Sequence, residues 1–412
     1  MNKILKELKD RGMLNNISSE EKLDKCIEEG KAVYIGFDPS FKSLHLGNYV
    51  MIRVLQIFKE NGIKIVPVLG GATGRIGDPS GKILERKILD NNLIEENIEN
   101  IFLQLKKLTN SEKIINNIIF YDNFNFLDFL RKIGKDFNMN YLISKDIIKN
   151  RLETGISYAE FSYSLIQSHD WYMLNKNFNV GIQCGGSDQW GNITNGLEYI
   201  RKKEGHDASV VGLTINLITK SDGTKFGKSE KGAIYIDKEV TSIFEMYQFL
   251  FNQKDEDVEN LLKFLSTFKI DEIIKIMKKH NNNPNLRLAQ KKLCENIIIN
   301  IHGNDEYLKV VNLAKLLFEE IYDTLTIGQI EDAFRNTPIF KIELDSNLID
   351  IITEHKIVSS KRIARELLND KSIKIDGNVV DILEIKMTEK NALCSKYFIL
   401  KKGKKNFYIL EL

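Results

Sequence analysis

The stretch "AVYIGFDPSFKSLHLGNYVMIRVLQIFKENGIKIVPVLGGATG", residues 32–74, decides the fold. It begins with a short apolar run that ends in glycine and phenylalanine, which is typical of a buried strand. Apolar residues at helical spacing follow in 48–62, and Gly62 is a signal for the end of that helix. A second apolar run with a glycine turn closes the stretch. This strand–helix–strand order predicts a parallel sheet with helices on both faces.

A second strand with a glycine turn lies further along the chain. The segment "NVGIQCGGSDQWGN", residues 179–192, repeats the pattern of strand, glycine pair and polar loop. In open α/β sheets, ligands bind beyond the carboxyl ends of the strands. The glycine-bearing loops at these strand ends therefore predict a single ligand-binding cleft.

The length of 412 residues predicts two or three domains. Helical periods dominate 240–325, so an all-helical domain is expected after the α/β domain. Nearer the end, Asp376-Gly377 is a hairpin signal within a helix and strand pattern. We expect a Rossmann-like α/β domain over 1–225 that includes a helix-rich stretch at about 115–160, a helical domain over 226–330, a linker over 331–346, and a small α+β domain over 347–412.

Composition excludes several classes of protein. The net charge of +2 gives no global signal for nucleic acid, although a local basic patch remains compatible with it. The four cysteines form no CxxC pair, which argues against a zinc ribbon or a redox pair, and no metal site is expected. No apolar run approaches ~18 residues, so no membrane span is expected. The charged start "MNKILKELKDRG" resembles neither a signal nor a transit peptide, which favours the cytoplasm.

The run "HLGN", residues 45–48, stands at the expected start of the first long helix. A helix N-terminus presents unpaired N–H groups and partial positive charge, which favour a phosphate. His45 can donate a hydrogen bond to a phosphate oxygen, and Gly47 would let a flat base or a ribose approach the backbone. The alternative is a histidine that caps the helix beside a structural glycine.

The segment "GGATGRIGDPSGKILER", residues 70–86, looks like a phosphate loop but fails the Walker pattern, because Gly81-Lys82 is followed by Ile83. A P-loop ATPase is therefore excluded. Asp78 is placed where it could bind an amino group. Lys82 and Arg86 are four residues apart and would share one face of a helix. A solvated charge pair is the alternative.

The segment "FSYSLIQSHDWY", residues 161–172, carries Tyr163, Gln167 and Asp170 at the spacing i, i+4, i+7, so the three share one helix face. Buried polar groups on an apolar helix need partners, which a small polar ligand would supply. A half-exposed polar stripe is the alternative. His169 lies off this stripe and is interpreted as structural.

The segment "KSDGTKFGKSE", residues 220–230, has three lysines and two glycines in eleven positions. Such a cationic loop could close on a polyphosphate and neutralise charge as it develops. The alternative is a solvated surface turn.

Taken together, these segments resemble a known family. "HLGN" resembles the HIGH motif of class I aminoacyl-tRNA synthetases, and "KFGKS" at 225–229 resembles their KMSKS motif. "YIGFDPS", "GGATGRIGDPSGK", YxxxQxxD and "GGSDQWGN" are together similar to bacterial-type tyrosyl-tRNA synthetases. The tail "SSKRIARELLNDKSIKIDGNVV", residues 359–380, resembles the small RNA-binding module that ends those enzymes and was first known from a ribosomal protein.

The resemblance implies a two-step reaction on a homodimer whose interface lies in a helical insertion at about 115–160. L-tyrosine attacks the α-phosphate of ATP, with Mg²⁺ carried on the phosphates, and pyrophosphate leaves. The tyrosine is then transferred to the 3′ end of tRNA(Tyr).

The resemblance also implies a role for each matching position. For tyrosine these are Tyr34 and Asp170 at the phenol, Asp78, Tyr163 and Gln167 at the α-amino group, and Asp38, Gln183 and Gln189 along the same pocket. For ATP they are Gly36, Ser40, His45, Gly47, Gly186, Asp188, Gln189 and Lys228. The implied catalytic positions are His45, Asn48, Lys82, Arg86, Lys225, Lys228 and Ser229.

One position departs from the family pattern, because Asn48 stands where the second histidine of the motif is expected. Asparagine retains an N–H₂ donor but carries no positive charge, so we expect activity to persist. Tyrosine is a sensible substrate, since its hydroxyl could satisfy both Asp170 and Tyr34. The tryptophanyl family is the nearest competitor, but an indole offers only an N–H donor. A non-catalytic RNA-binding relative is the third hypothesis.

In the tail, Lys361, Arg362 and Arg365 fall close together on one expected helix, which Ser359 or Ser360 would cap. A basic helix beside a small sheet suits a phosphate backbone, and the family context makes tRNA(Tyr) the expected partner. Further lysines flank this helix at Lys356, Lys371 and Lys374. A solvated helix in a lysine-rich protein is the alternative.

Overall fold

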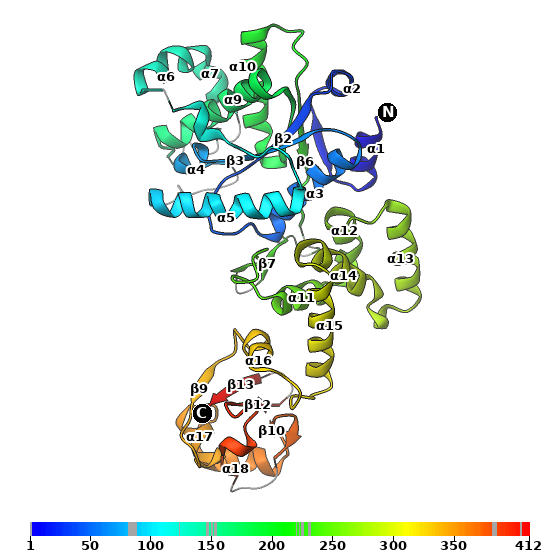
Figure 1. Ribbon diagram of the computed structural model, residues 1–412, viewed down its shortest axis with the longest axis vertical. Helices are drawn as coiled ribbons and strands as arrows, with labels where there is room; N and C mark the ends of the chain where they lie inside the picture. Colours follow the sequence, from blue (N-terminus) through cyan, green and yellow to red (C-terminus); the bar gives the residue numbers. More distant parts are fainter. Residues whose placement is uncertain are drawn as a thin grey trace. The chain divides into compact units, whose positions relative to one another are not determined.

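The computed structural model describes residues 2–80, 89–122, 124–145, 148, 149, 151, 155–219, 221, 223, 226–229, 232–380, 385–403 and 406–412. Two compact units make up the chain, one formed by Met1–Thr241 with Phe249–Ile301 and the other by Ser242–Gln248 with His302–Leu412. Figure 1 shows the elements of each unit.

The first unit contains a six-stranded sheet in the order β1-β6-β5-β2-β3-β4. All neighbouring strands pair in parallel except β1, which runs antiparallel to β6 at one edge. The predicted parallel α/β sheet is therefore confirmed. The strands are β1 (Leu14–Ile17), β2 (Ala32–Phe37), β3 (Ile65–Leu69), β4 (Ile115–Asn116), β5 (Val180–Gly186) and β6 (Val211–Ile215).

The chain order reverses between β2 and β5. From β2 the strands proceed outward through β3 to β4, and from β5 they proceed in the other direction to β6. Because such crossovers are right-handed, helix α3 (Leu46–Glu60) and helix α10 (Trp190–Glu204) cover opposite faces of the sheet, as Figure 1 shows. A ligand is expected beyond the carboxyl ends of β2 and β5, where the order reverses.

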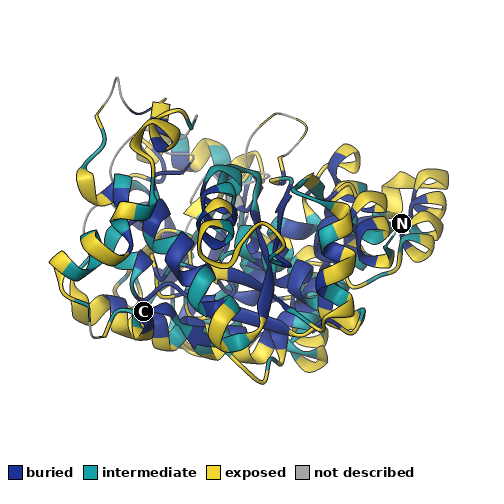
Figure 2. Cartoon of the chain, turned by 90° about the horizontal axis from the view of Figure 1, so that it is seen from above, coloured by how far each residue is buried: buried dark blue, intermediate teal, exposed yellow. Residues whose placement is uncertain are grey.

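Side-chain burial and capping explain these elements. Every residue of β3 is buried, and β2 exposes only Gly36. Helix α3 ends before Gly62, which has the positive φ of 82° expected of a residue that terminates a helix. Helix α9 (Tyr158–Phe178) is capped by Ser157, whose side chain accepts a hydrogen bond from the Glu160 amide. Figure 2 shows buried strands at the centre and exposed outer helix faces.

The remaining elements of the first unit are short or lie on its periphery. They are α1 (Lys3–Asp10), α2 (Glu20–Glu28), α4 (Thr73–Ile76), α5 (Asn91–Thr109), η1 (Asn117–Phe120), α6 (Phe126–Lys132), η2 (Gly134–Asp136), α7 (Met139–Ile143), η3 (Ser187–Gln189), β7 (Lys228–Ser229), β8 (Gly232–Ala233), α12 (Asp255–Leu265), α13 (Ile270–Asn282), η4 (Pro284–Leu286) and α14 (Leu288–His302), which ends one residue into the second unit.

The helices α12 to α14 belong to the same compact unit as the sheet. Buried Arg11, at the end of α1, donates to the Lys263 carbonyl at 2.8 Å and to the Phe268 carbonyl at 2.8 Å. Helix α12 also packs on α3. The expected helical domain at 226–330 is thus divided, because its first part is held to the sheet and residues from 302 onward group with the tail.

The second unit contains a five-stranded sheet in the order β11-β10-β12-β13-β9, with helices around it. Its core joins Leu348 and Ile352 of α17 to Leu368 of α18 and to strand residues such as Phe398 and Leu410. Its elements are α15 (Asn304–Phe318), α16 (Ile327–Ala333), β9 (Ile339–Lys341), α17 (Leu348–Glu354), α18 (Lys361–Asn369), β10 (Ile373–Ile375), β11 (Asn378–Val379), η5 (Glu389–Asn391), β12 (Tyr397–Lys402) and β13 (Asn406–Glu411). Helix α11 (Ile243–Phe251) spans the boundary between the units.

In the tail, the structure differs from the prediction at the expected linker and agrees with it at the expected turn and at the helix cap. Residues 331–346, expected as a linker, contain the end of α16 and strand β9, which pairs in parallel with β13. The expected turn at Asp376-Gly377 does join β10 and β11, and both of its residues have positive φ, 49° and 83°. Ser360 caps α18 by accepting a bond from the Ile363 amide at 3.3 Å.

Within the described residues, no helix has the length and apolar character needed to cross a membrane. In the same part of the chain, no group of three or more His, Cys, Asp or Glu side chains is arranged to hold a metal ion. All four cysteines are free thiols.

Candidate active site

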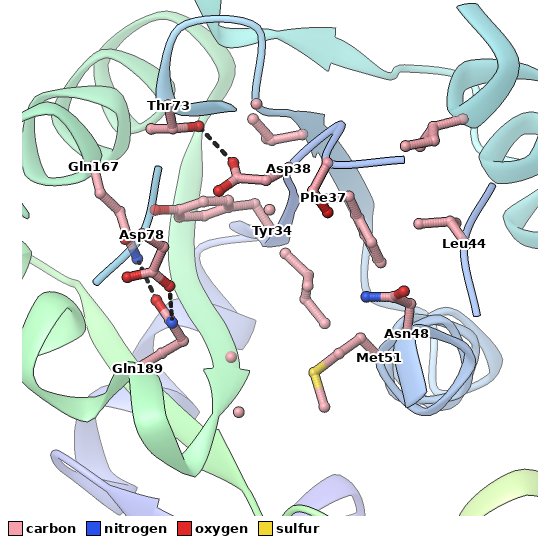
Figure 3. A pocket seen from close by; sticks show the side chains of 18 of the residues that line it. Tyr34, Phe37, Asp38, Leu44, Asn48, Met51, Thr73, Asp78, Gln167 and Gln189 are labelled. Atoms are coloured by element: carbon pink, nitrogen blue, oxygen red, sulfur yellow. Dashed lines mark hydrogen bonds between the residues drawn. The ribbon is translucent and has the colours of Figure 1, made fainter. Parts of the chain in front are cut away.

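A cavity of 430 Å³ opens beyond the carboxyl ends of β2 and β5, where the sheet order reverses (Figure 3). Most of the site residues expected from the sequence line it: Tyr34, Gly36, Asp38, Ser40, His45, Asn48, Asp78, Tyr163, Gln167, Asp170, Gln183, Gly186 and Gln189. Gly47 and Asp188 are not among the lining residues. Lys82, Arg86 and Lys225 lie outside the described residues, and only the backbone of Lys228 and Ser229 is described.

The three polar residues of α9 all reach this cavity from one face of the helix. Tyr163 Oη donates to Asp38 Oδ2 at 3.0 Å, and Gln167 Nε2 donates to Gln189 Oε1 at 3.4 Å. Asp170 follows one turn later and is 3% exposed. The spacing i, i+4, i+7 therefore presents a polar wall to the cavity.

Asp170 and Tyr34 meet at one end of the cavity. Asp170 Oδ1 accepts from Tyr121 Oη at 2.7 Å, and its Oδ2 accepts from Asn117 Nδ2 at 2.8 Å. Tyr34 is 3% exposed, and within the described residues its hydroxyl has no hydrogen-bond partner. Tyr34 and Gln183 are paired across β2 and β5, so their side chains project from the same face of the sheet.

Burial controls protonation at this end. Removal from water raises the pKa of Asp170 to about 7, and the hydrogen bonds from Tyr121 and Asn117 act in the opposite direction by favouring the carboxylate. Burial, helped by the charge of Asp170, also raises the pKa of Tyr34 well above its ordinary value. Tyr34 is therefore a hydroxyl donor, and Asp170 becomes an ionised acceptor as the pH rises above about 7.

A continuous chain of hydrogen bonds connects Asp170 to the neighbouring carboxylate of Asp38. Asn117 Nδ2 also donates to Thr73 Oγ1 at 3.1 Å, and that hydroxyl donates to Asp38 Oδ1 at 2.8 Å. The chain runs through six side chains: Tyr121, Asp170, Asn117, Thr73, Asp38 and Tyr163. Each member orients the next, so the two carboxylates are held as fixed acceptors.

Asp78 supplies a third carboxylate. Its Oδ2 accepts from Gln189 Nε2 at 2.6 Å and its Oδ1 accepts from the Ser80 amide at 2.9 Å. Figure 3 shows Asp78, Gln167 and Gln189 grouped beside Asp38 and Thr73. Three carboxylates with few compensating cations among the described lining residues make this part of the cavity a suitable site for an ammonium group.

Across the cavity, His45 and Asn48 cap helix α3 reciprocally. His45 Nδ1 accepts from the Asn48 amide at 3.2 Å, and Asn48 Oδ1 accepts from the His45 amide at 3.1 Å. The histidine-cap alternative is therefore realised in the geometry. It is compatible with phosphate binding, because a neutral ring that accepts at Nδ1 carries its proton on Nε2 and can donate there.

The cap lies directly against the segment that follows the lysine-rich motif. The Leu46 amide donates to the Ile234 carbonyl at 2.9 Å, and the Ile236 amide donates to the Leu44 carbonyl at 2.8 Å. Gly227 approaches so closely that a Cβ there would lie 3.2 Å from the Gly47 nitrogen. The two motifs that resemble HIGH and KMSKS are thus adjacent in the structure.

Two of the expected nucleotide-binding glycines leave room for neighbouring side chains. A Cβ on Gly47 would lie 2.8 Å from His45 Cε1, so this glycine makes room for the imidazole. A Cβ on Gly186 would lie 2.6 Å from Asp188 Oδ1. The carboxylate of Asp188 therefore packs over the Gly186 backbone at the end of β5.

The sequence analysis did not identify three residues of the site. Asn117 and Tyr121 follow β4, and Thr73 begins α4 after β3. A signal was present, since polar residues directly after successive parallel strands collect at one edge of a sheet. The strand β4 is only two residues long, so its end could not be located by periodicity.

The candidate RNA-binding residues lie on α18 in the second unit, and all three are exposed. Two of them form exposed ion pairs, Lys361 with Asp350 at 2.5 Å and Arg362 with Glu366 at 2.7 Å. Lys374, which flanks this helix in the sequence, forms an ion pair with Glu320, as does Lys401.

Comparison with known proteins finds matches to one group of enzymes along nearly the whole chain. Residues 28–319 match the family of class I tRNA synthetases (W and Y), and residues 329–410 match the tyrosine–tRNA ligase SYY-like C-terminal domain. The tyrosine–tRNA ligase of Ureaplasma parvum serovar 3 is 49% identical over 411 residues, covering 100% of this chain and 99% of the relative. That of Mycoplasma mobile is 45% identical over 415 residues, covering 100% of both.

Solved structures agree with this assignment. A C-terminally truncated mitochondrial tyrosyl-tRNA synthetase of Aspergillus nidulans has a TM-score of 0.70 at 30% identity, covering 77% of this chain and 95% of that one. The tyrosyl-tRNA synthetase of Archaeoglobus fulgidus, complexed with L-tyrosine, has a TM-score of 0.57 at 16% identity, covering 75% and 99%. The latter supports the fold alone.

Proposed function

The chain belongs to the tyrosine–tRNA ligase family, and on that premise we propose which residues carry each part of its reaction. It activates L-tyrosine with ATP to give tyrosyl-adenylate and pyrophosphate, and it then transfers tyrosine to the 3′ end of tRNA(Tyr). The observation that carries the choice of amino acid is the buried pair of Tyr34 and Asp170, a donor and an acceptor in one cavity.

The pair suits a phenol better than the other aromatic side chains. A phenolic hydroxyl can donate to Asp170 and accept from Tyr34 at the same time, whereas an indole N–H only donates. Phenylalanine would leave both groups buried without a partner. Sites of this kind reject the analogue that lacks the hydroxyl by about 10⁴–10⁵, a range for which this enzyme family is itself the known case.

The α-amino group of tyrosine is assigned to the carboxylate region. Asp78 accepts from Gln189, and Tyr163 donates to Asp38, so the acceptors there are already oriented. An ammonium group has three donors, which Asp78, Tyr163 and Gln167 can receive. The amino acid then spans the distance between two fixed ends and its carboxylate is directed toward the nucleotide.

Activation is an in-line displacement at phosphorus. A carboxylate oxygen of tyrosine forms a bond to the α-phosphorus of ATP while the bond to the bridging oxygen breaks, and pyrophosphate leaves with that electron pair. No side chain has to accept a proton in this step, so positioning and charge stabilisation carry the catalysis. His45 Nε2 and the start of α3 are the proposed donors to the phosphates.

Further charge is assigned to the lysines of the two motifs. Lys82 and Arg86, together with Lys225, Lys228 and Ser229, are proposed to stabilise pyrophosphate as it leaves. The adjacency of Gly227 and Gly47 supports the assignment of the second group, because it brings that backbone to the cap of α3. We infer that Mg²⁺ enters on the ATP phosphates, since no cluster of metal ligands occurs in the described part of the chain.

The second unit is assigned to tRNA(Tyr). Exposed Arg365 of α18 forms no ion pair with another described residue. Lys361 and Arg362 must exchange carboxylate partners for phosphate. An Arg365→Ala variant should therefore raise KM for tRNA while tyrosine activation is unchanged. An unchanged KM for tRNA would remove α18 from the proposed RNA surface.

We also propose that the protein is a homodimer of the cytoplasm, where tRNA is charged for translation. Several large apolar side chains of the helical insertion are exposed, and apolar side chains that are exposed in one region favour association. They are Ile119, Phe126, Leu127, Met139, Tyr141, Ile143 and Tyr158. Sedimentation equilibrium would return the mass of two chains, and a single-chain mass at micromolar concentration would contradict the dimer.

The test of function is ATP–pyrophosphate exchange, run separately with tyrosine, tryptophan and phenylalanine, followed by charging of tRNA(Tyr). Exchange should depend on tyrosine alone. Exchange with tryptophan would overturn the assignment of Tyr34 and Asp170 but not the mechanism. A folded protein that catalyses exchange with none of them would contradict the proposed roles as a whole.

A further inference from the structure

Tyr121 does not line the cavity itself but contacts Asp170, which does, and no sequence motif pointed to it. It follows η1 at the edge of the sheet, and its hydroxyl donates to Asp170 Oδ1 at 2.7 Å. The second carboxylate oxygen accepts from Asn117, four residues earlier in the chain, at 2.8 Å. One short segment after β4 therefore holds both oxygens of the acid that is proposed to bind the substrate phenol.

The hydroxyl of Tyr121 has two acceptors within reach but only one hydrogen. The Ile166 carbonyl lies at 3.0 Å, which is longer than the distance to Asp170. A carboxylate is the stronger acceptor, so the bond to Asp170 dominates while that group is ionised. Burial and the nearby Asp170 raise the pKa of Tyr121 well above its ordinary value, so the hydroxyl remains a donor.

We propose that Tyr121 is a positioning residue for tyrosine activation: its hydroxyl keeps the Asp170 carboxylate ionised and turned so that its remaining lone pairs receive the hydroxyl of the substrate. This inference rests on the proposed function, in which Asp170 accepts from the phenol. An ionised carboxylate has about four acceptor positions, and Tyr121 and Asn117 occupy only two of them. Without Tyr121 the carboxylate would be held from one side alone.

The groups around Asp170 determine the direction of the pH effect. Tyr34 and Asp38 face it from β2 and its end, Tyr121 lies directly after η1, and His169 precedes it on α9. Burial lowers the pKa of His169 to about 4, so that ring stays neutral above pH 5. Burial, with a smaller contribution from the charge of Asp38, raises the pKa of Asp170, and the bonds from Tyr121 and Asn117 lower it. Loss of that bond must therefore move the titration to higher pH.

The measurement is kcat/KM for tyrosine in pyrophosphate exchange between pH 6.5 and 9, which reports ionisations of the free enzyme. In Tyr121→Phe the inflection should rise by about one pH unit, because one charge-assisted hydrogen bond is lost. The loss relative to the parent enzyme should then be about tenfold at pH 6.5 and less than about threefold at pH 9. The preference for tyrosine over phenylalanine should fall in parallel, most at low pH.

Tyr172→Phe is the matched control. Tyr172 lies on α9 in the same aromatic cluster, and its ring contacts His169 and Tyr199 rather than Asp170. This variant removes the same atom and should leave the pH profile unchanged. The melting temperature of both variants would establish that they are folded at each pH.

Two results would overturn the inference while the parent enzyme still activates tyrosine. One is a Tyr121→Phe profile that superimposes on the parent profile. The other is a loss of equal size at every pH, which is what a purely structural role would give. Failure of the parent enzyme to activate tyrosine would instead contradict the proposed function, so the two failures are distinguishable.

Discussion

At the proposed tyrosine end of the cavity, six side chains from several elements form a single hydrogen-bonded chain, whereas at the proposed nucleotide end one residue pair caps one helix. The first arrangement runs from Tyr121 through Asp170 to Asp38 and Tyr163. The second consists of His45 and Asn48 at the start of α3. The tyrosine end is thus fixed by bonds between side chains, and the nucleotide end by two side chains that accept from backbone amides of one helix.

The difference follows from what each end has to recognise. A phenol is distinguished from a phenyl ring by one hydroxyl, so the groups that read it must be buried and fixed before the substrate arrives. A polyphosphate is recognised by charge and by N–H groups at a helix start, which tolerate small displacements. We therefore expect substitutions at the tyrosine end to act on tyrosine binding, and those at the nucleotide end to act mainly on kcat.

The largest effect is expected for Asp170→Asn. The amide retains one acceptor, but it loses the charge and turns an N–H₂ group toward either Tyr121 or Asn117. We expect kcat/KM for tyrosine to fall by about 10²–10³-fold, since a charge-assisted bond is lost and a buried donor is left unpaired. Pyrophosphate exchange at varied tyrosine and at varied ATP measures this.

The same experiment contains its own control. KM for ATP should change by less than about threefold in Asp170→Asn, because the nucleotide end does not share the hydrogen-bonded chain. Equal losses for tyrosine and ATP would show that the two ends are coupled, and the contrast between them would be lost.

The contrast also explains which site residues could be predicted from the sequence. Helical spacing on α9 was sufficient to bring Tyr163, Gln167 and Asp170 to one wall, because such a stripe is a local property of one helix. Asn117 and Tyr121 could not be found that way, since they depend on β4, whose position is set by pairing with β3. The sequence motifs identified His45 but not its reciprocal cap with Asn48.

In the fold too, features that depend on neighbouring residues were predicted, and features that depend on residues far apart in the sequence were missed. The strand–helix–strand order of 32–74 predicted the parallel sheet correctly, and Asp376-Gly377 predicted a hairpin turn that does join β10 and β11. The three-residue strand β9 was missed within the expected linker, because it exists only through pairing with β13 at the far end of the chain. Arg11, which binds carbonyls near 263–268, likewise gave no local signal that α12 joins the first unit.

A smaller effect is expected for Gly47→Ala at the nucleotide end. The new Cβ would lie 2.8 Å from Cε1 and 3.0 Å from Nδ1 of His45, so the imidazole must shift. We expect kcat to fall by about tenfold, which corresponds to one weakened hydrogen bond to the phosphates, with KM for tyrosine unchanged. Single-turnover formation of tyrosyl-adenylate measures the step directly. Gly328→Ala is a control, because a Cβ there meets open space on α16.

The smallest effect on activity is expected for Asn48→Ala. The substitution removes the acceptor that caps the His45 amide at 3.1 Å, together with the N–H₂ donor of the side chain. Loss of the cap should cost about 0.5–2 kcal/mol of unfolding free energy, which denaturant titration measures. Because the His45 ring still accepts from the backbone amide of residue 48, kcat should fall by less than about fivefold.

A fall of 10²-fold or more would show that the asparagine contacts the phosphates in the transition state. In that case the nucleotide end would depend on a side chain as strongly as the tyrosine end does, and Asn48→His would then be expected to restore most of the rate.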